Sequence, residues 1–110
     1  MKKKARVWIH CRISMQSSKI VLSYQKEELI RFTIQNNMKI IGITKLISDG
    51  KSLNQFEVKS MLSSIRRHEM DIVLLYSPSR LSIYPDVFEE FVLFCKMHNV
   101  KVFCLSDINY

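Results

Sequence analysis

Short apolar runs alternate with longer amphipathic segments along the whole chain. Runs of strand length cover the ranges Ala5–Cys11, Met38–Ile47, Asp71–Tyr76 and Lys101–Leu105. Apolar residues at helical spacing cover the ranges Val21–Asn36, Gln55–Arg67 and Pro85–His98. This alternation, with short connections, predicts one α/β domain over residues 1–110. We expect a mostly parallel sheet of about four strands, with right-handed crossovers that place helices on both faces.

The apolar faces and end signals of the helical segments are visible in the sequence. The face of the first segment is predicted to contain Leu22, Gln25, Leu29, Phe32 and Ile34. The second is predicted to bury Val58, Met61, Leu62 and Ile65. Asn36-Asn37 is a plausible stop for the first helix. Asn54, with Glu57 three residues on, resembles a capping box for the second.

Two of the strand segments are apolar on both faces, Ala5–Cys11 and Asp71–Tyr76, and we expect them at the centre of the sheet. In an open α/β sheet, ligands bind beyond the carboxyl ends of the strands. The loops expected at that edge are Arg12–Ile20, Ser48–Asn54 and Ser77–Ile83. The polar residues that they bring together are Arg12, Ser14, Asp49, Lys51, Ser52 and Arg80.

The formal net charge of +7 favours a polyanionic partner, most simply nucleic acid. The plainer alternative is a small basic protein with a solvated lysine tail. The three cysteines form no C-x-x-C pair and lie in apolar runs, which predicts buried, reduced thiols. The histidines lack metal-ligand spacing, so no metal site is predicted. No run approaches the ~18–20 apolar residues of a membrane span, and no secretory signal is present, so we expect a cytoplasmic protein.

Several chemistries do not fit the motifs of the chain. Neither G-x-G-x-x-G nor G-x-x-x-x-G-K-[ST] occurs, which argues against dinucleotide and P-loop sites. No G-x-S-x-G elbow surrounds Ser14, which argues against a Ser-His-Asp hydrolase. A serine flanked by arginines suits phosphoryl transfer, because guanidinium groups neutralise non-bridging oxygens and help to lower a serine pKa. The alternative is that Ser14 and Ser52 are turn hydroxyls and that Arg12 and Arg80 are solvated.

The segment Cys11–Ser14, C-R-I-S after an apolar strand, resembles the Y-x-R-x-S opening of the serine recombinases, the resolvase/invertase family. Other segments resemble family motifs in the same order. They are Tyr24-Gln25 (the early helix Gln), Ser48–Ser52 (D-x-x-x-S-G), Val58–Asp71 (the helix-to-strand stretch), Tyr76–Leu81 (K-L-D-R-L) and Val100–Leu105 (the following strand). The resemblance covers nearly all of residues 5–106 and implies the catalytic-domain fold of that family.

The resemblance implies that Ser14 attacks double-stranded DNA and becomes joined to the 5′ phosphate, after which strand exchange and religation follow. Arg12 and Arg80 match the catalytic arginines. The matching substrate-binding positions are Gln25, Asp49, Lys51 and Ser52. No metal or nucleotide cofactor is implied. The implied partners are DNA and further recombinase subunits, either as a homodimer or tetramer or through a full-length recombinase. No separate DNA-binding domain is expected in residues 1–110.

The chain departs from the family pattern at positions that bear on catalysis. The family tyrosine is His10, an arginine falls on Gln55, and the D-R-L-x-R signature has Ser79 and Ile83 in place of its Asp and second Arg. Each lost contact to a phosphoryl transition state costs on the order of 2–4 kcal/mol. Two hypotheses therefore stand beside each other: an active recombinase, and an impaired relative that serves as an interaction module or binds DNA non-specifically. An unrelated α/β phosphate- or nucleotide-binding protein is a third.

Overall fold

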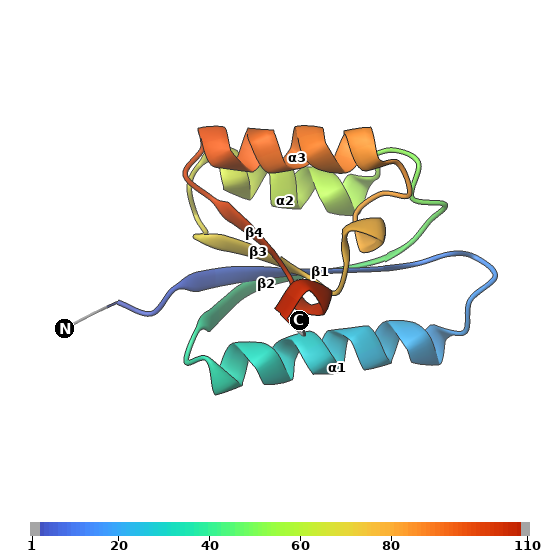
Figure 1. Cartoon of the computed structure of the whole chain (residues 1–110), viewed down its shortest axis with the longest axis horizontal. Helices are drawn as coiled ribbons and strands as arrows, with labels where there is room; N and C mark the ends of the chain where they lie inside the picture. The colour runs from blue at the N-terminus through green and yellow to red at the C-terminus, as the bar shows by residue number, and fades with distance from the viewer. Residues whose placement is uncertain (1–2, 109–110) are drawn as a thin grey trace.

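The computed structural model of the chain describes residues 3–108, which form a four-stranded sheet with helices on both faces (Figure 1). The elements in chain order are β1 (Arg6–Ile13), α1 (Lys19–Gln35), β2 (Lys39–Ile47), α2 (Phe56–Arg66), β3 (Ile72–Leu75), a 3-10 turn (Pro78–Arg80), α3 (Pro85–Met97), β4 (Lys101–Cys104) and a 3-10 turn (Leu105–Ile108). The alternation of strands and helices is thus the predicted one.

The strands are ordered β2-β1-β3-β4, and every pair is parallel. The central positions of β1 and β3 confirm the prediction from their continuous apolar character. Figure 1 shows α1 on one face of the sheet and α2 with α3 on the other. All strands therefore end at the same edge, the carboxyl edge, where the loops from β1, β2 and β3 meet. The predicted fold class is confirmed.

The side chains of β1 alternate between two core layers, as a strand requires. Val7, Ile9 and Cys11 are fully buried in the layer that includes Leu29 of α1. Trp8 points to the other layer, which α2 and α3 cover. This indole explains Gly42 on the neighbouring strand, because a Cβ there would lie 2.4 Å from the ring.

The boundaries differ from the prediction where polar residues join regular elements. Strand β1 continues through Arg12 and Ile13, which pair with Leu46 and Ile47, so Arg12 belongs to the strand and not to the loop. Helix α1 begins at Lys19, because the Ser18 side chain accepts a hydrogen bond from the backbone N–H of Ile20.

Two predictions about the helices were wrong. The N-cap of α2 is Gln55, without a side-chain hydrogen bond, and not Asn54. Ile34, predicted on the core face of α1, is 68% exposed. Thr33 is buried in its stead, because its hydroxyl donates to the Leu29 carbonyl oxygen (2.8 Å) and is therefore satisfied inside the core.

The remaining boundary predictions hold within a residue or two. Helix α1 ends at Gln35, followed by Asn36 as C-cap and by Asn37 with φ of 54°. All three cysteines are buried, as predicted. The predicted tail from Ser106 begins as the second 3-10 turn, and residues 109–110 lie outside the described part. Within residues 3–108, no helix is both long and apolar enough to span a membrane.

Candidate functional site at the carboxyl edge of the sheet

Arg12 is the centre of the carboxyl edge. It is the penultimate residue of β1 and is only 4% exposed. Its guanidinium donates from Nη1 to the Ser48 carbonyl oxygen (2.9 Å) and from Nη2 to the Ser79 carbonyl oxygen (2.6 Å). One side chain therefore ties the end of β1 to the loop after β2 and to the loop after β3.

The Asp-Gly turn supplies the space for this guanidinium. Gly50 has φ of +72°, and a Cβ on it would lie 2.7 Å from Cζ of Arg12. The Gly50 carbonyl oxygen accepts hydrogen bonds from the Ser82 hydroxyl (2.8 Å) and from the backbone N–H of Ile83 (2.9 Å). Glycine is thus required twice, for the left-handed backbone and for the close approach.

Gln25 of α1 holds the backbone of Arg12 from the other layer. Its Nε2 donates to the Arg12 carbonyl oxygen (3.0 Å), and its Oε1 accepts from the Arg12 N–H (3.4 Å). Gln25 is 2% exposed, so the amide is a buried clamp on the strand end. These two hydrogen bonds orient the end of β1, and the predicted role of Gln25 in substrate binding stays a prediction.

Arg80 and Asp49 lie close enough to Arg12 to act on its charge. Nη1 of Arg80 donates to the Arg12 carbonyl oxygen (3.4 Å). Burial lowers the pKa of the Arg12 guanidinium from its ordinary value, Arg80 lowers it further, and Asp49 opposes this. An arginine stays protonated despite such a shift, so the two cations coexist at this edge. Arg80 is half-buried and keeps part of its side chain in solvent.

Ser14 lies one residue beyond β1 and is partly exposed. Its hydroxyl lies 2.9 Å from the hydroxyl of Ser17, and its carbonyl oxygen accepts from the N–H of Ser17 (3.1 Å). The turn presents the hydroxyl at the surface of the edge. Sequence reasoning singled out Ser14 but missed Ser17, because a serine in a polar loop carries no signal of its partner.

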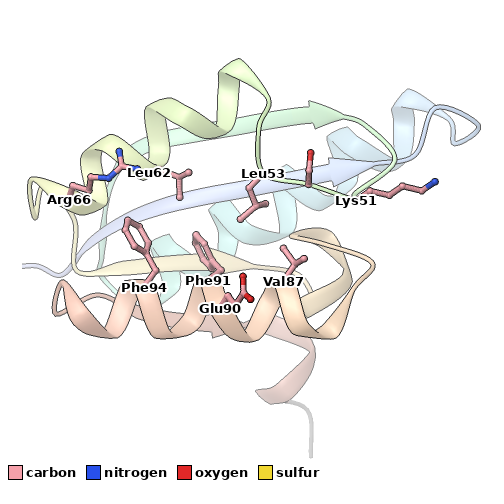
Figure 2. Close-up of a pocket in the computed structure, with 9 residues that line it drawn as sticks. Lys51, Leu53, Leu62, Arg66, Val87, Glu90, Phe91 and Phe94 are labelled. Atoms are coloured by element: carbon pink, nitrogen blue, oxygen red, sulfur yellow. The ribbon is translucent and has the colours of Figure 1, made fainter.

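Lys51 and Ser52 are placed differently from the other predicted residues. They line a cavity of about 370 Å³ between α2 and α3 (Figure 2), whose walls include Leu62, Phe91 and Phe94. The structure brings Arg12, Arg80, Asp49 and Gln25 together, whereas Lys51 and Ser52 line this cavity, and the exposed Lys51 side chain extends away from it (Figure 2). Lys51 also donates its backbone N–H to Asp49 Oδ1 (3.0 Å), which closes the turn.

The positions that depart from the family pattern have structural roles here. The Ser79 carbonyl oxygen accepts a hydrogen bond from Arg12. Gln55 is the N-cap residue of α2, and its Oε1 is buried without a partner among the described residues.

His10 is fully buried two residues before Arg12, and neither ring nitrogen has a hydrogen-bond partner within residues 3–108. Burial first, and then the charge of Arg12, lowers the pKa of His10 to about 4. Ile83 is 47% exposed.

The described residues contain no group of three or more histidine, cysteine, aspartate or glutamate side chains suited to a metal ion. The carboxyl edge carries the partly exposed hydroxyl of Ser14 and the guanidinium groups of Arg12 and Arg80. Guanidinium groups are suited to anionic oxygens, especially those of phosphate.

Comparisons with solved structures identify proteins of the same fold. The chain resembles the C-terminal catalytic domain of ISC1926 TnpA, an IS607-like serine recombinase, with a TM-score of 0.84 and 21% identity over 91% of this chain and 69% of that one. It also resembles the N-terminal catalytic domain of TP901-1 integrase, with a TM-score of 0.83 and 19% identity over 93% and 78% of the two chains. For a resolvase family site-specific recombinase from Streptococcus pneumoniae, the TM-score is 0.81, with 22% identity over 94% and 74%.

The TM-scores establish a common fold, and the family follows from a match to the sequence itself. No curated protein sequence matches the chain. The family model described as "Resolvase, N terminal domain" matches residues 7–110, which is nearly the whole chain. The chain therefore belongs to the resolvase family of serine recombinases.

Proposed function

We propose that this chain is a catalytic domain that cleaves and rejoins double-stranded DNA through Ser14. The observation that carries the proposal is the position of Ser14, a partly exposed hydroxyl directly after the central strand β1, in a chain of the resolvase family. Arg12 and Arg80 lie at the same edge and are joined by a hydrogen bond. The neighbouring hydroxyl of Ser17 holds Ser14 in the turn.

In the proposed step, Oγ of Ser14 attacks a backbone phosphorus and loses its proton. The bond from phosphorus to the 3′ oxygen breaks, and the 3′ oxygen leaves with a proton as a hydroxyl. The DNA is then joined to Ser14 through its 5′ phosphate. Attack by a 3′ hydroxyl on this phosphoserine reverses the chemistry and rejoins the strands, so no high-energy cofactor is consumed.

Arg80 is the cation best placed to contact a non-bridging oxygen, because part of its side chain remains in solvent. Arg12 serves as a positioning residue with a fixed charge, since its Nη atoms already donate to backbone carbonyls. Gln25 orients the strand end that carries Ser14. Asp49 moderates the repulsion between the two arginines. Lys51 and Ser52 are proposed to contact the DNA only where the duplex extends past the Asp-Gly turn at Asp49 and Gly50.

A second candidate function is that of an impaired relative which assembles with an active recombinase without cleaving DNA. The observation in its favour is that Arg12 is 4% exposed and occupied by the Ser48 and Ser79 carbonyl oxygens. Arg80 then carries the main solvent-accessible guanidinium group at this site. The family pattern, in contrast, has several arginines here. A single guanidinium stabilises a pentacovalent phosphorus less well than a cluster does.

The experiment that separates the two candidate functions uses DNA duplexes with a nick beside the scissile phosphate. After cleavage the short strand end dissociates from such a duplex, so the strand cannot be rejoined and the phosphoserine is trapped. The active domain yields a covalent protein–DNA adduct that Ser14→Ala abolishes. Ser23→Ala, an exposed serine on α1, serves as the matched control and keeps the adduct. Absence of an adduct on a duplex that an intact recombinase of the same system cleaves refutes the catalytic proposal and supports the second candidate.

A further inference from the structure

The amino edge of the sheet, opposite to Ser14, carries a concentration of positive charge. We define the basic edge as the side chains of Lys3, Lys4, Arg6, Lys39, Arg66, Arg67, Lys96 and Lys101. They come from the segment before β1, from the first residues of β1, β2 and β4, and from the ends of α2 and α3. Figure 1 shows these segments gathered at the end of the molecule where the N-terminus lies.

Hydrogen bonds between the strand starts fix the order of residues along the basic edge. The N–H of Lys39 donates to the Ala5 carbonyl oxygen (2.8 Å), and the N–H of Lys101 donates to the Asp71 carbonyl oxygen (3.0 Å). Arg6 pairs in register with Lys39 across β1 and β2. Lys39 and Lys101 thus lie on the two outer strands, separated by three strand spacings, or about 14 Å.

The acidic side chains within the basic edge are already neutralised. Asp71 accepts from Nε and Nη2 of Arg6 (both 3.1 Å), and this pair lowers the pKa of the Asp71 carboxyl. Glu69 pairs with Arg67 (3.3 Å). Lys39 and Lys101, in contrast, are exposed and have no ion pair with another described residue. The charge that remains free at this edge is therefore positive.

Helix dipoles explain only part of this charge. Arg66 and Lys96 lie in the last turns of α2 and α3, where a cation is stabilised by the negative helix end. Lys39 and Lys101 belong to strands, and sheets have small net dipoles. Their placement at the starts of the two outer strands, both exposed, spreads positive charge across the width of this edge, as expected of a surface that binds a polyanion.

We propose that the basic edge binds the phosphate backbone of duplex DNA, independently of the chemistry at Ser14. Duplex DNA is the polyanion favoured here, because its repeated phosphates can reach the unpaired Lys39 and Lys101, about 14 Å apart, without requiring a pocket. A second copy of this chain is disfavoured by repulsion between like-charged edges. Strand β1, with 8 residues, separates the two edges by about 26 Å, so the basic edge faces away from a duplex bound at Ser14 and takes a second segment of DNA.

The test uses fluorescence anisotropy of a labelled mixed-sequence duplex titrated with the full chain, from about 50 to 200 mM salt. The edge variant is Lys39→Gln/Lys101→Gln, and the matched control is Lys45→Gln/Lys59→Gln, which removes two exposed lysines elsewhere on β2 and α2. The edge variant is expected to lose roughly tenfold or more in affinity, and the slope of log K against log salt is expected to fall by about 1.8, while the control loses much less.

Lys39→Arg/Lys101→Arg is expected to restore binding, which separates charge from damage to the fold. The anisotropy titration requires no cleavage at Ser14, so a failure of the cleavage proposal leaves this result intact. The proposal is overturned if the unchanged chain does not bind the duplex, or if the edge and control variants lose affinity equally. A dimer in sedimentation that Lys39→Gln/Lys101→Gln dissociates, without an effect on DNA affinity, also overturns it and assigns the edge to self-association.

Discussion

His10 makes the stability of this fold sensitive to mild acid. The imidazole is fully buried in the middle of β1, and its pKa is lowered to about 4 by burial first and by the charge of Arg12 second. An unfolded histidine has a pKa near 6.5. Below that value the unfolded chain binds a proton that the folded chain excludes, so the folded state loses stability as the pH falls from about 6.5 toward 4.

The magnitude follows from the two pKa values. Between pH 7.5 and pH 5, the lower pKa of the folded state is expected to reduce the free energy of unfolding by about 2 kcal/mol. Urea unfolding at the two pH values measures this difference directly. This interval lies above the ordinary pKa values of Glu69 and Asp71. Hydrogen bonds with Ser64 and then Arg67 lower the pKa of Glu69, and the hydrogen bond with Arg6 lowers that of Asp71, so their losses come at more acidic pH.

The decisive variant is His10→Phe, which removes the titrating ring while filling the buried site. Its free energy of unfolding is expected to change little between pH 7.5 and pH 5. His68→Gln removes an exposed imidazole instead and is expected to keep the full loss, because His10 remains in place. Equal losses in His10→Phe and in the unchanged chain refute the assignment, as does an unchanged chain with no loss.

Three substitutions in the core and at the candidate site give further expectations, each measured by urea unfolding. Gly50→Ala is expected to lower stability by about 1–3 kcal/mol, because the φ of +72° disfavours alanine and the new Cβ meets the Arg12 guanidinium. Thr44→Val is expected to cost about 1–3 kcal/mol, since it removes the acceptor of the buried Trp8 Nε1–H (2.7 Å). Gln25→Met keeps the volume but releases the Arg12 backbone, at a similar cost.

The chain also offers controls for these variants. Thr44→Ser keeps the hydroxyl that Trp8 requires and is expected to recover most of the stability lost in Thr44→Val. Ser52→Ala, in the same loop as Gly50, is expected to stay within about 0.5 kcal/mol of the unchanged chain. A stable Gly50→Ala variant contradicts the close packing of the turn on Arg12. A Gln25→Met variant as stable as the unchanged chain contradicts the role of the amide as a clamp.

The fold was predictable because the sequence patterns are local and mutually consistent. The apolar runs marked the two central strands, and short connections between alternating elements required parallel pairing. The errors occurred where a tertiary contact overrode a local preference. Ile34 fits a helical apolar stripe, but the neighbouring hydroxyl of Thr33 satisfies itself on the helix backbone and takes the buried position.

The candidate site was predictable only at the level of which loops converge. The carboxyl edge follows from strand direction, and the segments that carry Arg12, Ser14 and Arg80 all lie at this edge. The direction of a long side chain does not follow from the sequence. Arg12 turns inward because two loop carbonyls face it, whereas the exposed Lys51 side chain extends away from the cavity that this residue lines (Figure 2). Both facts depend on loop conformations that no local pattern encodes.

The environment of Arg12 connects the unusual residues of this chain. Its guanidinium is held by carbonyl dipoles, and His10, which lies two residues before it, is neutral at physiological pH. An ion pair with a carboxylate would cancel the positive charge, whereas carbonyl dipoles stabilise the charge and leave its net value intact. The low polarisability of a buried site extends the field of that charge. Arg12 can therefore favour an anion near the end of β1 without touching it, so one buried guanidinium both clamps the loops and stabilises negative charge at this edge.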